Sequence, residues 1–436
     1  MRYTAAALVA LGTLWYTWSP GLGMTGDDAE FVVLARSIAA GEGLSYINAP
    51  VPYAATKYPP LFPLMLAPVS QAIGAMQAVV GGCFVILAVL ASGYGGLAAG
   101  LLIGVNPLLA TYSSQIMSEI PYAALTLGAL WCLAPYCTFA PKNDTLGIKF
   151  AWGLALAVLA YYTRSAGIVL LIAIPFTVKS RQARIAGVLA AVMPVAAWSV
   201  RNLLAGGAGP SYLEQLLLRN PYYPDAGWAS IGDLANRCAN NVGTYWPWII
   251  AVACLMILDT DRLRKLYVVG IMALAIVWPW PDWRFMVPLV PVMAVAWVQG
   301  LPGQRYWVVH GMLLVASLTL LPRPPIYPDS WNRYVEASQW IKRNTDRDAL
   351  VSCRKEYTTH VLANRKTTVY AFGTPGEVVA DMDHQGVSHV IVDNLGYPST
   401  RKHLIPAINA HESRFKIVWH KPHPDTWVLE KIPDAH

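Results

Sequence analysis

The sequence predicts a mostly α-helical protein that crosses a membrane many times and carries a small α/β domain at its C-terminal end. Of its 436 residues, 55% are hydrophobic and 13% are charged, which is about half the charged fraction usual in soluble proteins. The mean hydropathy is +0.40. Long apolar runs alternate with short polar breaks up to residue 321, and eight of the nine histidines lie beyond it. We therefore expect a membrane domain over 1–321 and a soluble domain over 322–436.

The first apolar run, from Ala5 to Trp18, predicts a membrane helix that is retained in the mature protein. Arg2 precedes it, as in a signal peptide, but no A-x-A-like cleavage site follows. A spanning helix needs about 20 apolar residues. Eleven stretches come close to this requirement: 4–20, 75–92, 97–115, 119–138, 149–163, 165–178, 185–203, 244–258, 267–281, 285–300 and 305–321.

The segment 59–74, PPLFPLMLAPVSQAIG, is apolar but contains four prolines. Proline removes a helix hydrogen bond and clashes with the preceding turn. We expect an interfacial or re-entrant helix here, within a first outer loop that covers 21–74.

The charges of the short loops predict the orientation. With the N-terminus in the cytoplasm, the inside loops carry dense basic clusters, while the loop 204–243 and residues 322–436 lie outside. By the positive-inside rule this is the favoured arrangement in an inner (plasma) membrane, with a periplasmic or extracellular C-terminal domain. The net charge of +7 then reflects cytoplasmic loops and requires no nucleic acid partner. The inside clusters are Lys142 and Lys149, KSRQAR (179–184), DRLRK (261–265) and Arg305.

The C-terminal residues alternate between strand-like and helix-like patterns, which favours a partly parallel sheet. A helix is expected over 374–386, with a cap at Thr374 and a glycine stop, and another over WNRYVEASQWIKRN. No glycine-rich phosphate-binding motif follows a strand, so nucleotide binding is not indicated. The expected strands cover 349–353, 367–372, 389–394, 415–420 and 426–431.

Ionisable residues gather in the segments predicted to lie outside. The first loop opens with Asp27, Asp28 and Glu30, and further charges occur at the outer ends of helices: Glu119, Arg164, Asp282 and Arg284. Each alone has an ordinary explanation, such as snorkelling to headgroups or a pair within a loop. Several on one face instead favour a functional cavity, because ionisable groups at membrane depth are costly.

These motifs together resemble the GT-C glycosyltransferases, in particular the protein O-mannosyltransferases and the lipid A aminoarabinose transferases. The resemblance covers about 1–300. It rests on the order and spacing of GDDAEFVVLARSIAAGEG, KYPPLFPL, SEIPY, TRSAGIV and DWRFMVPLVP. It implies a donor sugar on a polyprenyl phosphate, made inside the cell and used outside.

The resemblance also implies roles for individual residues. It makes Asp27 the general base, although the next position, Asp28, is commonly Glu in the family, and Glu119 stands where relatives often have Asp. Tyr58 separates Lys57 from the prolines, which is a further departure. The implied sets are catalytic Asp27, Asp28 and Glu119; donor phosphate-binding Arg164, Lys57 and Arg284; and substrate-binding Glu30, Tyr58 and Asp282.

Transfer from a polyprenyl phosphate needs these residue types. The leaving phosphate gains charge, which fixed cations in a water-poor cavity stabilise. The attacking hydroxyl loses a proton, which a carboxylate accepts. Direct displacement would invert the anomeric configuration. The acids are numerous enough to bind a divalent metal ion, but no ligand spacing demands one.

Two other classes of function compete with this interpretation. A lipid or sugar transporter or flippase would be expected to show internal repeats and broken helices near mid-membrane, and no repeat is visible. A non-catalytic envelope assembly protein would use the outer domain as a binding module and would tolerate Asn at Asp27. The expected partners are a polyprenyl-phosphate-linked sugar, membrane lipids, and an acceptor that is a protein, a lipid or a glycan.

Overall fold

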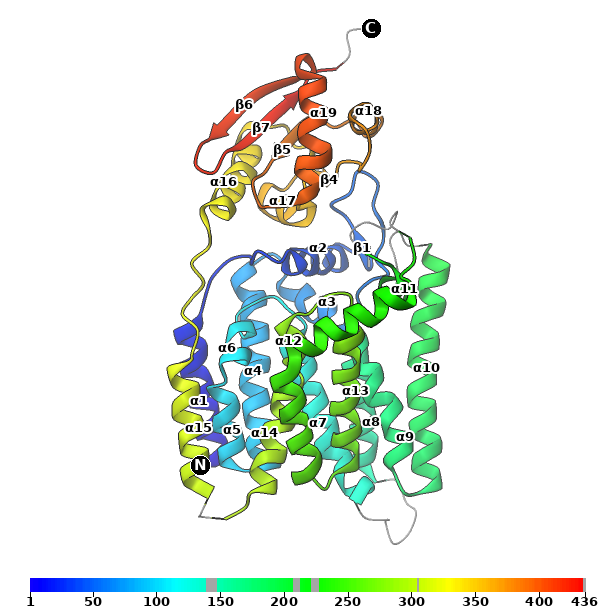
Figure 1. The fold of residues 1–436 in the computed structure, drawn as a ribbon, viewed down its shortest axis with the longest axis vertical. Coiled ribbons are helices and arrows are strands. Elements are labelled where there is room, and N and C mark those ends of the chain that lie inside the picture. Colours follow the sequence, from blue (N-terminus) through cyan, green and yellow to red (C-terminus); the bar gives the residue numbers. More distant parts are fainter. Residues whose placement is uncertain (139–146, 207–211, 221–226, 304–305, 434–436) are drawn as a thin grey trace. The chain divides into compact units, whose positions relative to one another are not determined.

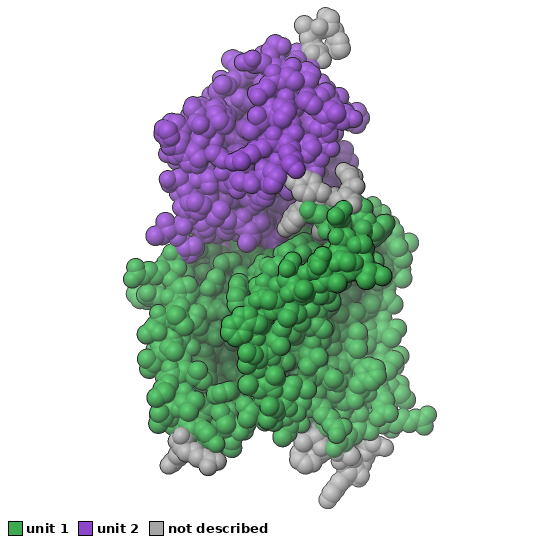
Figure 2. All heavy atoms as spheres, in the orientation of Figure 1, with its two compact units in different colours: residues 1–20, 56–65, 74–324 green, residues 21–55, 66–73, 325–436 purple. Residues whose placement is uncertain are grey.

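The computed structural model describes residues 1–138, 147–206, 212–220, 227–303 and 306–433. The inside residues Lys142 and Arg305 lie outside these ranges. The chain forms two compact units (Figure 2): unit 1 comprises 1–20, 56–65 and 74–324, and unit 2 comprises 21–55, 66–73 and 325–436. The sequence predicts that 21–74 belongs to the membrane domain, whereas 21–55 and 66–73 group with the C-terminal residues in the structure.

The regular elements described for unit 1 are helices (Figure 1), apart from one isolated β-bridge between Leu218 and Trp228. The predicted interfacial segment forms a helix of six residues, α3 (Leu61–Leu66), which is too short to span a bilayer. The remaining elements are α1 (Arg2–Thr17), α4 (Ile73–Gly95), α5 (Leu97–Gly104), α6 (Pro107–Tyr112), α7 (Glu119–Thr138), α8 (Ile148–Thr163), η2 (Ser165–Gly167), α9 (Ile168–Thr177), α10 (Arg181–Ala205), α11 (Tyr212–Leu217), α12 (Ile231–Leu258), α13 (Arg262–Val277), η4 (Trp283–Met286), α14 (Leu289–Gly300) and α15 (Trp307–Thr319).

Among the described residues, four helices are long and apolar enough to cross a membrane: α4, α7, α10 and α12. Shorter apolar helices cover Ile148–Thr163, Ser165–Thr177, Leu289–Gly300 and Trp307–Thr319. The chain is thus mostly helical and carries membrane-spanning helices, as predicted, but the predicted number of eleven spans is not confirmed.

Two predicted spans differ from the structure. The stretch 97–115 is not one helix, because α5 ends at Gly104 and Asn106 starts a new helix, accepting a hydrogen bond from the Leu109 amide at 3.1 Å. Helix α12 begins at Ile231, well before the predicted 244, with a capping box between Ser230 and Asp233.

Polar contacts define two ends of unit 1. At one end, the Gln77 amide of α4 donates to the carbonyls of Ser19 at 2.9 Å and Ser114 at 2.8 Å. This brings the end of α1 and the residues just before α7 beside the start of α4.

The opposite end of α4 meets a buried charged network. Arg264 of α13 pairs with Asp259 at 2.6 Å and donates to Gln299 at 2.6 Å, and Gln299 donates to the Tyr94 carbonyl at 2.7 Å. The basic cluster 261–265 therefore lies at the end of unit 1 away from Gln77.

Unit 2 contains a five-stranded mixed sheet with the order β4-β3-β5-β7-β6 (Figure 1). β4, β3 and β5 are parallel, and β7 pairs antiparallel with β5 and β6. Its elements are α2 (Asp27–Ala39), β1 (Ser45–Tyr46), β2 (Tyr53–Ala54), η1 (Ala67–Val69), α16 (Asp329–Asn344), β3 (Leu350–Ser352), α17 (Glu356–Ala363), β4 (Lys366–Thr368), α18 (Pro375–Gln385), β5 (His389–Val392), the π-helical turn η6 (Thr400–Leu404), α19 (Ile405–Ala410), η7 (Glu412–Arg414), β6 (Phe415–Lys421) and β7 (Thr426–Lys431).

Side-chain alternation along the strands gives the sheet two packed faces. Val351, Ile391 and Val428 belong to a buried cluster with α16, whereas Val390 and Leu429 belong to a cluster with α18 and α19. Successive residues of a strand point to opposite faces, so the sheet is covered by helices on both sides.

The first loop packs with the sheet inside unit 2. The Thr367 amide of β4 donates to the Asn48 carbonyl at 2.8 Å, and the Lys366 ammonium donates to the Ile47 carbonyl at 2.7 Å. The Tyr46 ring stacks on Tyr357 of α17 with the ring centroids 5.4 Å apart, within the range of roughly 4.5–7 Å that aromatic pairs prefer. These contacts cover the outer edge of β4, which would otherwise present unpaired backbone groups.

Candidate functional site

The nine predicted site residues divide between the two units. Asp27, Asp28 and Glu30 lie on α2 in unit 2. Unit 1 holds the other six: Lys57, Tyr58, Glu119, Arg164, Asp282 and Arg284. Each group is described within its own unit.

In unit 1, Glu119 and Arg164 form an ion pair. The Arg164 Nη1 atom lies 2.7 Å from Glu119 Oε1, and the Glu119 side chain is fully buried. Arg164 also donates to Ser118 Oγ at 3.1 Å. The sequence around Arg164 shows no acid, so this partner, 45 positions away, was not anticipated. Neither Glu119 oxygen has a well-aligned hydrogen-bond donor among the described residues. The charge of Arg164 is therefore what stabilises the buried carboxylate.

A second pair lies close to the first. Asp282 Oδ2 is 3.1 Å from Arg284 Nε, and Asp282 Oδ1 accepts the Arg284 amide at 2.9 Å. Tyr245 holds the backbone of this turn, accepting from the Asp282 amide at 2.7 Å. The pair is therefore local, as one of the alternatives from the sequence supposed.

The two pairs are close enough for their charges to interact. Arg164 interacts with the charges of Glu119 and Arg284 and with Tyr58. The Tyr112 hydroxyl at the end of α6 interacts with all four charged groups: Asp282, Glu119, Arg284 and Arg164. Arg164 contacts Ser118, which lies four residues after Ser114, the residue that Gln77 binds. The two charged pairs therefore lie at the end of unit 1 opposite Arg264.

Lys57 and Tyr58 precede the short helix α3. The Lys57 ammonium lies 4.4 Å from the centroid of the Tyr58 ring, which is a cation–π contact. Tyr58 is buried, and its interaction with Arg164 connects this pair to the other charged groups of unit 1.

In unit 2, the acid pair occupies the first turn of α2. Gly26 begins the helix with a φ of 87°, a left-handed conformation that glycine adopts at little cost. Asp27 is half-buried, whereas Asp28 is only 3% exposed. Acidic residues are favoured at this position because the helix N-terminus carries partial positive charge.

The two acids have different surroundings. Asp28 accepts hydrogen bonds from the Ala29 amide at 2.9 Å and from the Gly23 amide. Burial raises the pKa of Asp28 from its ordinary value of 3.8 to about 6, and the charge of Asp27 adds to this effect. Asp28 therefore fastens the turn that leads into α2, and Asp27 is the more accessible of the two carboxylates.

Glu30 has an internal partner. It is 3% exposed, and Glu30 Oε1 accepts the Tyr46 hydroxyl at 2.6 Å. This bond joins α2 to β1. It gives the carboxylate a structural role that the sequence pattern did not indicate.

Lys355, in the turn after β3, is a charged residue of this region that the sequence analysis missed. Its ammonium donates to the Met24 carbonyl, and its charge opposes the rise in the pKa of Asp28. Lys355 is buried, which is uncommon for lysine unless it is paired. Lys355 follows the short strand β3, and no motif in the sequence links it to Asp28.

The described residues form no evident metal site. Among the described residues, no group of three His, Cys, Asp or Glu side chains could hold a metal ion. Both Asp28 oxygens already accept backbone amides.

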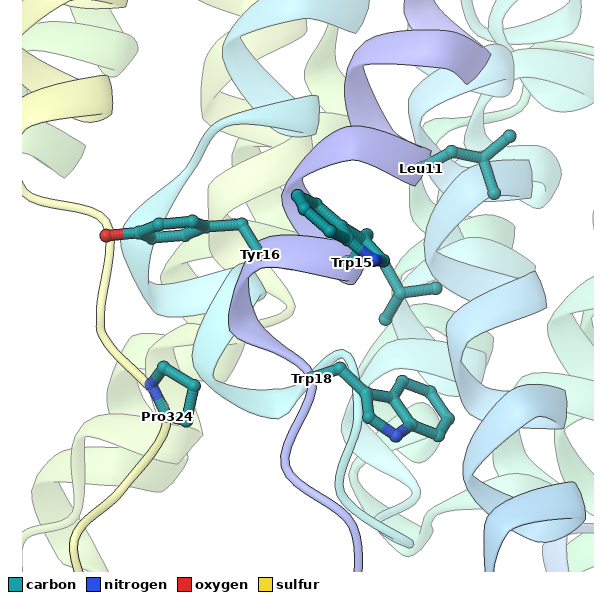
Figure 3. A pocket seen from close by; sticks show the side chains of 6 residues that line it. Leu11, Trp15, Tyr16, Trp18 and Pro324 are labelled. Atoms are coloured by element: carbon teal, nitrogen blue, oxygen red, sulfur yellow. The ribbon is translucent and has the colours of Figure 1, made fainter.

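A surface groove of about 720 Å³ lies along the end of α1 (Figure 3). Its lining is largely aromatic and contains none of the nine predicted residues: Leu11, Leu14, Trp15, Tyr16, Trp18 and Pro324. Trp and Tyr are enriched where helices meet the membrane–water interface.

Solved structures resemble the whole chain. ArnT from Cupriavidus metallidurans bound to undecaprenyl phosphate matches with a TM-score of 0.59 at 11% identity, covering 99% of this chain and 98% of that one. The Archaeoglobus fulgidus oligosaccharyltransferase tethered to an acceptor peptide matches with a TM-score of 0.56 at 11% identity, covering 100% and 74%. Both are GT-C glycosyltransferases. The chain has the GT-C fold.

This fold confirms the resemblance found in the sequence motifs, and an aminoarabinose transferase is among the GT-C matches. The mycobacterial arabinofuranosyltransferase AftD also matches, with a TM-score of 0.54 at 14% identity, covering 100% of this chain and 42% of that one. No model of a known protein family matches the sequence, and no curated protein matches it.

Proposed function

We propose that the chain is a glycosyltransferase of the inner membrane that moves a sugar from a polyprenyl phosphate to an acceptor hydroxyl on the outer face. The observation that carries the proposal is the charged group of unit 1, where Arg164 and Arg284 lie together beside a buried glutamate. The GT-C fold agrees with it. A matching ArnT structure contains undecaprenyl phosphate, and a matching archaeal oligosaccharyltransferase contains dolichol-phosphate and a peptide.

The cations of unit 1 are suited to the donor phosphate. As the bond from the sugar to phosphate breaks, negative charge grows on the phosphate oxygens, and preorganised cations stabilise that charge most effectively where water is scarce. Arg164 keeps further donors beyond those used for Glu119 and Ser118, because a guanidinium has five. We assign phosphate binding to Arg164, Arg284 and Lys57, and substrate contacts to Tyr58 and Asp282.

Glu119 supports Arg164 in this assignment. Its buried carboxylate, only 2.7 Å from Arg164 Nη1, fixes the position of the guanidinium without covering all of its donors. Fixed charges contribute to catalysis because they need not reorganise when the reaction occurs.

The acids of unit 2 supply the base. Asp28 is buried and accepts two backbone amides, whereas Asp27 is half-buried and more accessible, so we assign to Asp27 the proton of the acceptor hydroxyl. The hydroxyl oxygen forms a bond to the anomeric carbon while the bond to the phosphate oxygen breaks, and the proton passes to Asp27. This displacement inverts the anomeric configuration. Partial burial and the neighbouring Asp28 carboxylate would strengthen the base.

The orientation follows from the two ends of unit 1. The charged group lies at the end opposite the basic cluster 261–265. If the basic loops are cytoplasmic, the reaction takes place on the periplasmic side. For residues 322–436 we propose the same side, as the charges of the short loops predict.

The test is Asp27→Asn in the purified protein in lipid, supplied with polyprenyl-phosphate sugars and extracts that contain acceptors. We expect transfer to fall by about 100- to 10,000-fold, the usual contribution of a general base, while donor binding persists. Asp346→Asn, a change at an exposed aspartate of unit 2, is the matched control and should retain activity. If Asp27→Asn stays within about threefold of wild type, the base assignment is wrong. An assembly protein would show no transfer with either the wild type or Asp27→Asn.

A further inference from the structure

The sheet of unit 2 reverses its strand order at β3. The chain passes from β3 to β4 on one side and then to β5 on the other, and all three strands are parallel. In open α/β sheets, ligands bind beyond the carboxyl ends of the strands where the order reverses. The residues just after β3 and β5 are therefore the first place to look for a binding site in this unit.

The turn after β3 is held rigidly. The Cys353 amide donates to the Thr368 carbonyl at 3.0 Å. The buried Tyr334 hydroxyl contacts both the amide and the carbonyl of Lys355 at 3.3 Å, and it lies 2.7 Å from Thr359 Oγ1. The backbone on both sides of Arg354 is thus fixed by neighbouring elements.

The Arg354 guanidinium lies against aromatic rings. Its central carbon is 4.8 Å from the centroid of Tyr397 and 5.7 Å from that of Phe372. Such stacking orients the guanidinium plane and leaves the N–H groups at its edge available. Within the part of the chain that the structure describes, Arg354 makes no hydrogen bond or ion pair, and its buried Nε lacks an acceptor.

Beyond β5, Asp393 offers an unused acceptor. It is 5% exposed, and its Oδ1 accepts the Leu395 amide at 3.0 Å, whereas Oδ2 is buried with no hydrogen-bond partner among the described residues. Burial raises the pKa of Asp393, and the charge of Arg354 opposes the rise. The two groups are thus electrostatic neighbours that do not form an ion pair. Unpartnered buried polar groups are rare and call for a ligand or another explanation.

We propose that the carboxyl ends of β3 and β5 bind an anionic sugar group, with its phosphate or carboxylate on Arg354 and a hydroxyl donating to Asp393. A fork of guanidinium donors matches the two oxygens of such an anion. A ligand with both an oxyanion and a hydroxyl can pair with Arg354 and also donate to Asp393. A simple anion cannot do both, because it would be repelled by the negative charge of the Asp393 carboxylate.

This site adjoins the acid pair inside unit 2. Lys355, the next residue after Arg354, donates to the Met24 carbonyl and interacts with Asp28. A ligand on Arg354 would be held by the same unit that carries Asp27. We therefore assign this site to the acceptor of the reaction; that role rests on the proposed function, whereas the binding itself does not.

The experiment is calorimetric titration of the full-length protein in lipid nanodiscs with glucose 6-phosphate, inorganic phosphate and glucose. We expect glucose 6-phosphate to bind more tightly than either of the other two. Arg354→Gln should weaken it by about 10- to 100-fold, the loss expected for a hydrogen bond to a charged group. Asp393→Asn should weaken glucose 6-phosphate and leave phosphate unaffected or tighter.

Arg347→Gln, at an exposed arginine in the turn between α16 and β3, is the matched control and should bind as wild type. Arg354→Lys keeps the charge without the fork and should give an intermediate affinity. The proposal is overturned if wild type binds no glucose 6-phosphate at millimolar concentration, if phosphate binds equally well, or if Arg354→Gln folds and binds as wild type. If Arg354→Gln does not fold, Arg354→Lys with wild-type affinity overturns it in the same way.

The transfer assay separates this inference from the proposed function. If Arg354→Gln loses the sugar phosphate but Asp27→Asn transfers normally, the site stands and the proposed chemistry does not. If Asp27→Asn abolishes transfer and Arg354→Gln changes neither binding nor the KM for the acceptor, the chemistry stands and this site does not.

Discussion

Replacing Arg164 with alanine should destabilise unit 1 as well as reduce activity. The Glu119 side chain is fully buried, and its partner at 2.7 Å is Arg164, whose side chain is 22% exposed. Removing one member of a buried pair leaves an uncompensated charge, which costs about 3–5 kcal/mol. Because Arg164 is partly exposed, solvent weakens the pair, and we expect a loss of about 3 kcal/mol in the free energy of unfolding.

The assay is chemical denaturation of the purified protein in detergent micelles. Arg219→Ala is the matched control, since Arg219 pairs with Asp233 at 3.6 Å and its side chain is 62% exposed. An exposed pair contributes at most about 1 kcal/mol. Equal destabilisation by Arg164→Ala and Arg219→Ala would refute the reasoning from burial.

A double variant distinguishes the structural role of Arg164 from its catalytic role. Adding Glu119→Gln to Arg164→Ala removes the stranded charge, so stability should recover relative to Arg164→Ala alone. Transfer should not recover, because the cation assigned to the donor phosphate is still missing. Recovery of both would make Arg164 a partner of Glu119 and nothing more.

Three further outcomes are expected. The pKa of Asp28 is raised to about 6, because the ionised carboxylate is disfavoured in the folded state. The free energy of unfolding should therefore be highest below about pH 4. It should fall by about 3 kcal/mol as the pH rises through 6. Asp28→Asn should remove this part of the pH dependence, and an unchanged difference from wild type between pH 4 and pH 7.5 would contradict it. Tyr46→Phe removes the hydroxyl that donates to Glu30 and should lower the free energy of unfolding by about 2 kcal/mol. Tyr16→Phe, at an exposed ring, is the control and should lower it little. Equal losses would count against the buried hydrogen bond. A reporter fused to the C-terminus should be active in the periplasm, and activity confined to the cytoplasm would reverse the proposed orientation.

Local signals in the sequence predicted several elements closely. Helix α18 begins after the Thr374 cap, which forms a capping box with Glu377, and ends before Gly386 with a φ of 74°. The five expected strands each have a counterpart, although β4 ends at Thr368, before the predicted 372. Such signals work because caps, glycine stops and alternating patterns act within a few residues.

Hydropathy alone gave poor helix boundaries in the membrane unit. The first turns of α12 carry Arg237 and Asn241, which lower the hydropathy and made this stretch look like a loop. In the structure Arg237 donates to the carbonyls of Leu216 and Leu218, and the Asn241 amide donates to the Trp278 carbonyl. These side chains serve neighbouring segments, which a window along one segment cannot detect.

The candidate site was predicted as a set of residues but not as a set of contacts. The motif order supplied Glu119, Arg164, Asp282 and Arg284, yet the Glu119–Arg164 pair depends on the packing of α7 beside α8. Lys355 was missed for the same reason, since it lies 331 positions from Met24, the residue that it binds. Contacts of this range are not encoded in local spacing.

The attachment of the first loop to the sheet edge also sets an order for biosynthesis. Lys366 and Thr367, which bind the carbonyls of Ile47 and Asn48, follow them by 319 residues. At about 5–20 residues per second, this stretch takes roughly 15–65 s to synthesise. Throughout that interval the acid pair has been made, but the strand that anchors its loop has not. A chain still on the ribosome therefore lacks the finished surroundings of Asp27 until β4 has emerged.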